Sequence, residues 1–374
     1  MSILTIIAWG LVGMAVGYGL LLGVLTYYWS QIPESVVPQL AKSPTISVIV
    51  AARNEAATIQ LTLTALLRQA YSAATLEYMV INDHSTDETL AILQQRGFAQ
   101  LTILNLEEKT GKKAALRMGI SASKGDLLVF TDADCTMVPH WLTQLANSAR
   151  SGADMVLAPV QIRYAPGFLN ALQGLDVAGT MLLTGASTQM GYPLLANGAN
   201  LAIKRPVFEQ LNGYAGNTHR ASGDDVFLLQ KAVQSGKVSI QFLPHSEAIV
   251  QTSAVPNWPA FFRQRLRWAS KTSSYTDYRL VVFQAFVYFL CVGLLLATGL
   301  SWYFPRLRYS CLLAWGIKTL VDTLFLTYAC RAVGDQRWLK WFLPAQLVHT
   351  FYIVTVGTLA LFPIKVRWKG RSIE

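Results

Sequence analysis

The stretch that decides the fold reads Asp126-Leu-Leu-Val-Phe-Thr-Asp-Ala-Asp-Cys135, an apolar run that ends in two carboxylates one residue apart. The run predicts a buried strand that carries Asp132 and Asp134 at its C-terminal end. Two such charges repel unless a cation lies between them, and carboxylate oxygens suit Mg²⁺ or Mn²⁺. Because ligands of open α/β sheets bind beyond the carboxyl ends of strands, the pair indicates a metal–diphosphate site. Taken alone, it is equally consistent with a polar turn.

The composition indicates a membrane protein. Of the 374 residues, 52% are hydrophobic and only 14% are charged, against about 25% charged in typical soluble domains. Ile3–Trp29 carries no charge and is long enough to cross a hydrocarbon core of about 30 Å. No basic residue precedes it, and it is longer than the apolar region of a signal peptide. We therefore expect residues 1–30 to form a retained transmembrane anchor.

Three further apolar stretches occur late in the chain, at Leu280–Phe304, Tyr309–Cys330 and Trp341–Phe362. They predict about three transmembrane or re-entrant helices within 280–362. The middle stretch carries Lys318 and Asp322. It is therefore either re-entrant or a true span in which the two side chains pair at i and i+4. The topology stays open, because three full spans would place the basic tail 363–374 outside, against the positive-inside rule.

The net charge of +10 is concentrated beside these apolar stretches. One cluster precedes the first of them and another fills the tail: Arg263, Arg265, Arg267, Lys271, Arg279; Lys365, Arg367, Lys369, Arg371. Such clusters are typical of segments that meet anionic headgroups on the cytoplasmic face of a bilayer. The flanking spans argue against nucleic acid as a partner. The four cysteines and five histidines show no spacing typical of a disulfide framework or a zinc site.

The region between the anchor and the late stretches alternates strand and helix patterns. Alternation of this kind predicts a mainly parallel sheet with right-handed crossovers. The expected strands are Thr45–Ala52, Tyr78–Ile81, Leu101–Leu104, Leu127–Phe130 and Met155–Val160; the expected helices are Thr58–Gln69, one that starts with a capping box at Ser85-Thr-Asp-Glu88, and Lys113–Ser123.

Charged residues follow three of the strands: Arg53 and Glu55 after the first, Asp83 after the second, and the aspartate pair after the fourth. We call the residues that directly follow a strand its exit. Three charged exits on one edge of a sheet predict a cleft. Thr110-Gly-Lys-Lys113 is not a Walker A loop, because position 106 is leucine. Lysines at a helix start would nevertheless favour an anion there, although a solvated basic turn is the alternative.

These residues resemble the nucleotide-sugar-binding half of a membrane-integrated, family-2 inverting glycosyltransferase with a GT-A fold. The resemblance covers about 41–275 and rests on an ordered set of motifs. They are Ala51-Ala-Arg-Asn-Glu55, Asn82-Asp-His-Ser-Thr-Asp87, the DxD at Asp132–Asp134, Asn197-Gly-Ala-Asn200 with Arg205, Phe208 and Gly213-Tyr214, Ser222-Gly-Asp-Asp225, and Gln264-Arg-Leu-Arg-Trp268 of the QxxRW type. Asp224 departs from the pattern, since glutamate is commoner there.

The resemblance implies a role for each matching residue. Asp225 corresponds to the catalytic base, Asp134 to the metal ligand, Asp132 to a residue near ribose or metal, and Asp83 to the uracil contact. It extends the nucleotide site to Ala51, Arg53, Glu55, Lys112 and Lys113, and the diphosphate and acceptor side to Asp224, Asn197, Gln264, Arg267 and Trp268. Asp224 could instead cap a helix at Val226–Val233. Likewise, the QxxRW segment could simply be an amphipathic interfacial helix, placed within 256–275.

The expected architecture is thus an α/β GT-A domain at 41–255 plus α-helical membrane segments. The expected activity is metal-dependent inverting transfer of a hexosyl or N-acetylhexosaminyl group from a nucleotide sugar, chiefly a UDP-sugar, to a membrane-embedded acceptor. The few polar positions in the spans favour a lipid acceptor over a processive polysaccharide synthase, unless a further membrane subunit supplies spans. A non-catalytic sugar-nucleotide sensor is a third hypothesis. The cofactor is Mg²⁺ or Mn²⁺, and the location is the cell (inner) membrane, multi-pass, with the catalytic domain cytoplasmic.

Overall fold

The computed structural model describes residues 3–33, 43–72, 75–95, 101–108, 111–216, 223–270, 277–362, 366–368 and 371–373. The chain divides into two compact units, each described by itself. Unit 1 comprises Met1–Ser30, Tyr164–Ala186 and Ala254–Val366, and unit 2 comprises Gln31–Arg163, Ser187–Ser253 and Arg367–Glu374.

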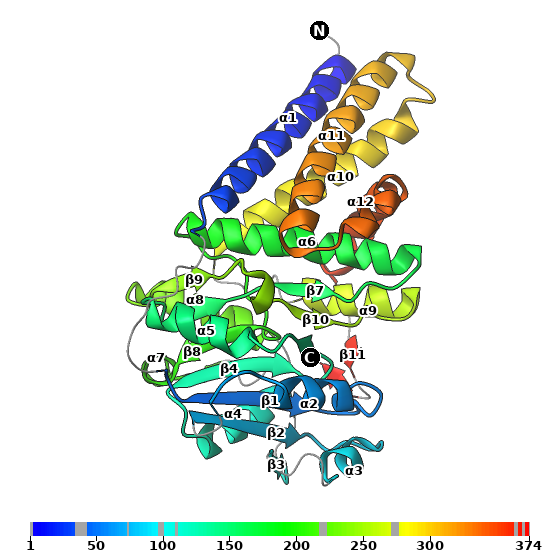
Figure 1. Ribbon diagram of the computed structural model, residues 1–374. Coiled ribbons are helices and arrows are strands. Elements are labelled where there is room, and N and C mark those ends of the chain that lie inside the picture. The colour runs from blue at the N-terminus through cyan, green and yellow to red at the C-terminus, as the bar shows by residue number, and fades with distance from the viewer. Residues whose placement is uncertain are drawn as a thin grey trace. The chain divides into compact units, whose positions relative to one another are not determined.

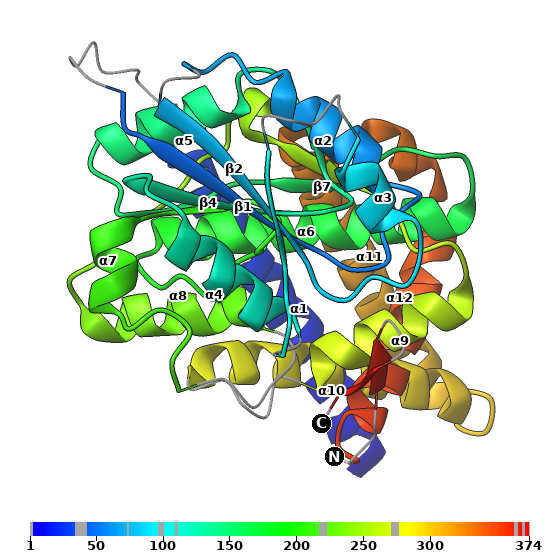
Figure 2. The same ribbon diagram turned by 90° about the horizontal axis from the view of Figure 1, so that it is seen from below.

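Unit 2 is built on a seven-stranded sheet in the order β3-β2-β1-β4-β8-β6-β9 (Figures 1 and 2). Its strands are β1 (Ile46–Ala52), β2 (Leu76–Asn82), β3 (Thr102–Asn105), β4 (Leu127–Asp132), β6 (Met155–Leu157), β8 (Leu201–Lys204) and β9 (Ile240–Phe242). The first four are parallel, and β8 runs antiparallel to both β4 and β6. The predicted mixed, mainly parallel sheet is therefore confirmed.

The register brings the ends of the central strands level. Ala51 of β1 lies opposite Ile81 of β2 on one side and Asp132 of β4 on the other. Parallel strands expose their carboxyl ends at the same edge, so the segments that follow β1, β2 and β4 meet there. This edge carries the candidate site.

Helices cover both faces of this sheet. In Figure 2, α2 (Ile59–Leu67) and α5 (Trp141–Arg150) lie on one face and α4 (Lys112–Ala122) on the other. The α4 helix packs closely because Gly119 has no side chain: an added Cβ would lie 2.5 Å from Ile81 and 2.8 Å from Ile49. Unit 2 also contains α3 (Thr89–Leu93), α7 (Arg205–Gln210), α8 (Asp224–Ser235) and the short 3-10 helix η3 (Ser246–Ala248).

A second, three-stranded sheet has the order β5-β10-β7, with β5 (Thr136–Met137), β7 (Val160–Ile162) and β10 (Val250–Thr252). The single strand predicted at Met155–Val160 is wrong, because it divides between β6 in the large sheet and β7 in the small one. Pro159 lies between them and has no N–H to donate to a ladder, so a continuous central strand cannot pass through it.

Most predicted elements of unit 2 agree with the structure to within two residues, and two predicted caps are wrong. Ser85 does not cap α3, which starts at Thr89, and Asp87 instead accepts the Thr89 N–H at 3.0 Å. Asp224 does not cap α8 but is its first residue, after Gly223 in a left-handed conformation with φ 91°. In that conformation glycine carries no steric cost.

Unit 1 is helical. It contains α1 (Ile3–Ser30), most of α6 (Phe168–Gln189), α9 (Trp258–Ala269), α10 (Tyr278–Leu300), α11 (Arg308–Val333), α12 (Phe342–Leu359) and the 3-10 helices η5 (Pro305–Leu307) and η6 (Gln336–Trp341). Among the described residues, four segments are long and apolar enough to cross a membrane: Ile6–Ser30, Tyr278–Leu300, Pro305–Val333 and Gln336–Leu359. A further pair of short strands, β11 (Val366–Trp368) and β12 (Arg371–Ile373), lies in the segment predicted as a basic tail.

The α11 helix runs beside α1 (Figure 1) and is unbroken over 26 residues. Lys318 Nζ lies 2.5 Å from Asp322 Oδ2, and the Tyr18 hydroxyl of α1 donates to Asp322 Oδ1 at 2.6 Å. Of the two interpretations of this segment, the structure favours the continuous span with an internal ion pair over the re-entrant one. Lys271, Lys365 and Lys369 lie outside the described residues.

Candidate active site

The ends of β1 and β2 are held together by hydrogen bonds. Arg53 Nη1 donates to the carbonyl oxygens of Asp83 at 2.8 Å and His84 at 3.3 Å. Asn54 and His84 both adopt left-handed backbone conformations, with φ 51° and 54°. Such conformations cost free energy in non-glycine residues and are found where the surroundings enforce them, often at functional sites.

Asp83 is fixed at this edge. Its side chain is almost fully buried; Oδ2 accepts the Gly111 N–H at 3.1 Å, and Oδ1 lies 3.1 Å from His84 Nδ1. Glu55, the other acidic residue at these exits, accepts the Thr58 hydroxyl at 3.1 Å. The predicted nucleotide residues of the first two exits are therefore neighbours in the fold.

The aspartate pair lies at the end of β4, as predicted. Asp132 is the last residue of the strand and pairs with Lys112, the first residue of α4. Asp134 lies in the following turn, and its Oδ2 accepts the Thr252 hydroxyl of β10 at 3.0 Å. The small sheet thus orients the second carboxylate.

These two carboxylates can hold a metal that arrives with its substrate. No cluster of three or more His, Cys, Asp or Glu side chains suited to a metal occurs in the part of the chain that the structure describes. Mg²⁺ in proteins is commonly held by one or two carboxylates, with waters and substrate phosphates completing the shell. The donor set fits such a shared site.

The Lys112 ammonium is held in its charged form. Burial alone would lower the pKa of Lys112, but attraction from Asp132, Asp224 and Asp225 outweighs burial and raises that pKa above its ordinary value. The ion pairs of Lys112 with Asp132 and of Lys113 with Asp224 show that the start of α4 lies between the two acidic motifs.

Asp225 is oriented by two backbone donors. Its Oδ2 accepts the Gly198 N–H and its Oδ1 accepts the Val226 N–H, both at 2.8 Å. Gly198 follows Asn197, whose Oδ1 accepts the Ala199 N–H at 3.0 Å and so shapes this turn. The Asn197 segment therefore lies against the predicted base. Ser222 lies outside the described residues.

Asp224, beside the predicted base, faces α4. Its Oδ1 lies 3.5 Å from Lys113 Nζ, and both side chains are buried. Lys112 and Lys113 are adjacent in sequence but contact different acidic motifs. Their predicted contact with nucleotide stays a prediction.

The QxxRW residues belong to α9, in unit 1. Gln264 Oε1 accepts from Arg265 Nη1 at 2.9 Å, and Trp268 is 40% exposed. The buried member of the motif is Arg265, whose guanidinium lies 2.5 Å from Asp176 of α6 and 4.3 Å from the Trp268 ring centroid. The predicted roles of Gln264, Arg267 and Trp268 stay predictions.

Sequence reasoning missed three contributors to these arrangements: Thr252, Gly198 and the Arg265–Asp176 pair. Each acts across a long stretch of chain. Thr252 contacts a residue 118 positions earlier, and no local pattern marks a threonine for such a contact. Gly198 lies inside the quoted Asn197 motif and Arg265 inside the quoted Gln264 motif, and these motifs were the available signals.

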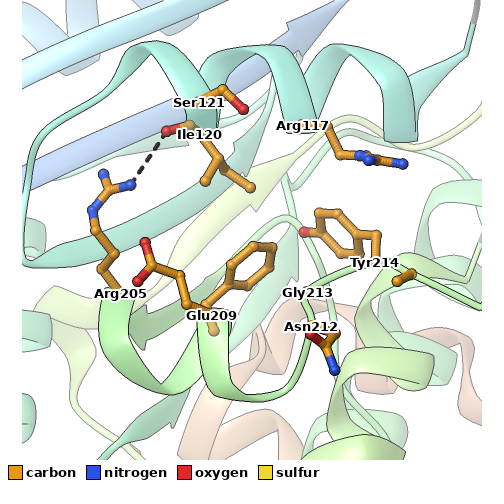
Figure 3. Close-up of a pocket in the computed structure, with 10 residues that line it drawn as sticks. Arg117, Ile120, Ser121, Arg205, Glu209, Asn212, Gly213 and Tyr214 are labelled. Carbon is orange, nitrogen blue, oxygen red and sulfur yellow. Dashed lines mark hydrogen bonds between the residues drawn. The ribbon is translucent and has the colours of Figure 1, made fainter.

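A separate cavity of about 500 Å³ lies in unit 2 between α4 and α7 (Figure 3). Arg117 and Tyr214 face it, while Arg205 donates to the Ile120 carbonyl at 3.2 Å. Burial, followed by the charges of Asp224 and Asp225, raises the pKa of Tyr214. None of the predicted nucleotide or metal residues lines this cavity, so it is distinct from the site at the strand ends.

The sequence is similar to those of known glycosyltransferases. Residues 47–209 match the family model described as glycosyl transferase family 2. The chain is 30% identical over 196 residues to glycosyltransferase AglE of Haloferax volcanii, covering 52% of this chain and 62% of that protein. It is 29% identical over 236 residues to probable glycosyltransferase YdaM of Bacillus subtilis, covering 60% of this chain and 54% of that protein. The matched segments thus span between half and two thirds of these relatives.

Among solved structures, the fold is similar to that of mannosyltransferase PcManGT from Pyrobaculum calidifontis, determined in complex with GDP-Man and Mn²⁺. The TM-score is 0.59 at 20% identity, over 96% of this chain and 99% of that one. At this identity the likeness shows the fold alone, while the similarity to glycosyltransferases comes from the family match at 47–209 and the two relatives.

Proposed function

We propose that this chain, with its glycosyl transferase family 2 match at 47–209, transfers a sugar from a nucleotide sugar to a membrane-embedded acceptor. The observation that carries the proposal is the approach of three carboxylates to the two lysines at the start of α4. Asp132 pairs with Lys112, Asp224 lies 3.5 Å from Lys113, and the charge of Asp225 also acts on Lys112. Asp134 lies in the turn directly after Asp132, and two neighbouring carboxylates repel each other unless a cation lies between them.

In this proposal Asp134 and Asp132 would hold Mg²⁺ or Mn²⁺, and the bound ion would supply positive charge against the nucleoside diphosphate. The similar mannosyltransferase was solved with Mn²⁺, which supports a divalent ion here. Lys112 is the adjacent cation of the chain itself. Its position on the first turn of α4 suits contact with a diphosphate, because helix N-termini favour anions.

Asp225 acts as the base. The acceptor hydroxyl oxygen attacks the anomeric carbon, its proton passes to Asp225, and the bond to the diphosphate breaks. The Gly198 and Val226 N–H groups fix the carboxylate and use one lone pair on each oxygen. An ionised carboxylate has about four acceptor positions, so a further one is free for the proton. One base and one displacement give inversion.

The nucleotide binds at the ends of β1 and β2. Ala51 is small, and it lies between Ile81 and Asp132 in the register. In this proposal Arg53, Glu55 and Asp83, which follow β1 and β2, contact the nucleoside. The resemblance also assigns Lys113 to this set, but its ammonium lies 3.5 Å from Asp224, and we leave it out of the nucleotide site. We favour UDP as the nucleotide. Because the similar mannosyltransferase was solved with GDP-Man, the test also includes a GDP-sugar.

A lipid is the favoured acceptor. The four candidate spans support a chain at a bilayer, and we assign the exposed Trp268 ring on α9 as a flat face for an acceptor. The alternative is a processive polysaccharide synthase, which needs polar groups along a path through the spans. In the described part of unit 1, Lys318, Asp322 and Tyr18 bond to one another and so favour the lipid. The sensor hypothesis is weaker, since the base and metal carboxylates are all present.

We place the protein in the cell (inner) membrane as a multi-pass protein with unit 2 on the cytoplasmic side, where nucleotide sugars occur. The predicted domain limits, 1–30, 41–255, 256–275, 280–362 and 363–374, belong to this proposal.

The test incubates the purified chain with radiolabelled UDP-sugars and GDP-mannose, Mg²⁺ or Mn²⁺, and extracted membrane lipids. The expected product partitions into organic solvent. A long water-soluble polymer would instead select the synthase, and nucleotide binding without transfer would select the sensor. Asp225→Asn should lower transfer about 10²- to 10⁴-fold with nucleotide binding kept. Asp154→Asn is the matched control, because Asp154 pairs with Lys204 and has no part in the proposed chemistry.

A further inference from the structure

Lys113 is an unusual lysine. It is only 7% exposed, on the first turn of α4, and its ammonium lies 3.5 Å from Asp224 Oδ1 and 5.8 Å from the centroid of the Phe227 ring. Asp224 is itself only 6% exposed. A buried lysine loses the hydration of its ammonium group, which costs free energy. An acidic partner is needed to compensate this cost.

The two lysines of α4 divide their contacts. Lys112 pairs with Asp132 of the DxD motif, and Lys113 pairs with Asp224, beside the proposed base Asp225. Positive charge at a helix N-terminus is disfavoured by the helix dipole. Acidic groups close to both lysines offset this unfavourable interaction. The single turn of α4 therefore links the two acidic motifs of the site.

We propose that Lys113 is a positioning residue for the base and not a nucleotide ligand. Its ammonium compensates Asp224 and holds the first turn of α8, so that Asp225 remains the one carboxylate that takes the acceptor proton. This inference rests on the proposed function, because it assigns Asp225 the role of base.

The charges around Asp225 make the consequence specific. Among the described residues, Lys112 and Lys113 of α4 lie in the field of the Asp224–Asp225 pair. Without Lys113, the Asp224 carboxylate would lie next to Asp225 without this cation. Two neighbouring like charges repel each other, so the first turn of α8 would shift and Asp225 would lose its position against the acceptor.

The experiment compares four variants of the full chain: Lys113→Met, Lys113→Arg, the double variant Lys113→Met with Asp224→Asn, and Lys112→Met. Methionine keeps the apolar stem and removes the charge. We expect Lys113→Met to lower kcat about 10- to 100-fold, the range of a small misplacement of reacting groups. The donor KM and the Kd for UDP or GDP should change less than about twofold, because the proposal gives Lys113 no nucleotide contact.

The other variants separate charge compensation from packing. Lys113→Arg should keep most of kcat, and the double variant should recover part of the kcat lost in Lys113→Met, because both charges of the pair are then absent. Lys112→Met should show the opposite pattern, with weaker nucleotide binding. The inference is overturned if Lys113→Met weakens nucleotide binding as much as Lys112→Met does, or leaves kcat unchanged.

Thermal melts keep the inference testable if a single variant folds poorly. The double variant replaces a buried ion pair by neutral groups, which proteins commonly tolerate. If Lys113 and Asp224 are coupled, the double variant melts at a higher temperature than the sum of the two single effects predicts. Additive shifts would overturn the pairing. Melts and nucleotide binding need no turnover, so a wild-type chain that transfers no sugar would count against the proposed function and not against this pair.

Discussion

Each unit of the molecule contains a buried lysine paired with an aspartate, and the two pairs differ in their surroundings. Lys318 and Asp322 lie four residues apart on α11, and the Tyr18 hydroxyl occupies the second carboxylate oxygen. Lys113 and Asp224 come from two different helices, and their neighbours in sequence are Lys112 and Asp225. In the first pair, both carboxylate oxygens of Asp322 are bonded, one to Lys318 and one to Tyr18. The second pair lies beside the charged groups to which we assign roles in the proposed reaction.

The difference separates two uses of a buried charge. Within apolar helices, an ion pair with all oxygens bonded lowers the cost of burial and holds α1 against α11. At the start of α4 and α8, the ion pair lies beside Asp225, the proposed base. We therefore expect changes in unit 1 to affect stability and changes in unit 2 to affect turnover.

The largest expected effect is on stability in unit 1. Lys318→Met should lower the free energy of unfolding by about 3–5 kcal/mol, because it leaves the buried Asp322 carboxylate without its cation. Thermal melts in detergent measure the loss. The double variant Lys318→Met with Asp322→Leu should recover most of it. A lower kcat per folded molecule in the double variant would contradict this division between the units, because the Lys318–Asp322 pair would then contribute to turnover.

Removal of the metal tests unit 2. Chelation with EDTA, or Asp134→Asn, should lower transfer at least about 100-fold, which corresponds to about 2.7 kcal/mol in the activation barrier. Melting temperature should change little, since Asp134 lies in a turn at the sheet edge. Restoring Mn²⁺ should rescue the chelated wild type and not the variant. Full activity in EDTA would contradict the metal-dependent mechanism.

Tyr18→Phe is a smaller test of the pair in unit 1. It removes the hydroxyl that donates to Asp322 at 2.6 Å and keeps the ring. The expected loss of stability is about 0.6–1.7 kcal/mol, the range of hydrogen bonds between membrane helices. Chemical denaturation in detergent checks it, with Tyr28→Phe as the matched control on α1. An unchanged stability would show that α1 is held by packing alone.

The smallest expected effect sharpens the role of the small sheet. Thr252→Val keeps the shape of β10 and removes the hydroxyl that donates to Asp134. The loss of one such hydrogen bond, about 0.5–1.5 kcal/mol, should weaken Mn²⁺ affinity in the presence of UDP about two- to tenfold. Calorimetric titration measures this affinity. If it does not change, the hydroxyl does not orient the metal ligand.

The local patterns of the sequence determined much of this molecule. The apolar run 127–130, followed closely by Asp132, predicted both β4 and the place of its carboxylates, because a short apolar run is typical of a buried strand and the polar residues after it mark the end of that strand. Spacing of four residues likewise predicted the Lys318–Asp322 pair, since side chains at i and i+4 share one face of a helix. Such outcomes follow from covalent geometry and short-range periodicity.

Only the tertiary structure decided the partners across the chain. The sequence placed Lys113 at a helix start and proposed Asp224 as a cap, yet the lysine lies against that aspartate, which is inside its helix. Thr252 reaches Asp134 through a second sheet that no local pattern indicated. These contacts depend on the order of the strands and on the insertion of β8 antiparallel beside β4. The strand order is set by packing of the whole sheet. It therefore cannot be predicted from any short segment of the sequence.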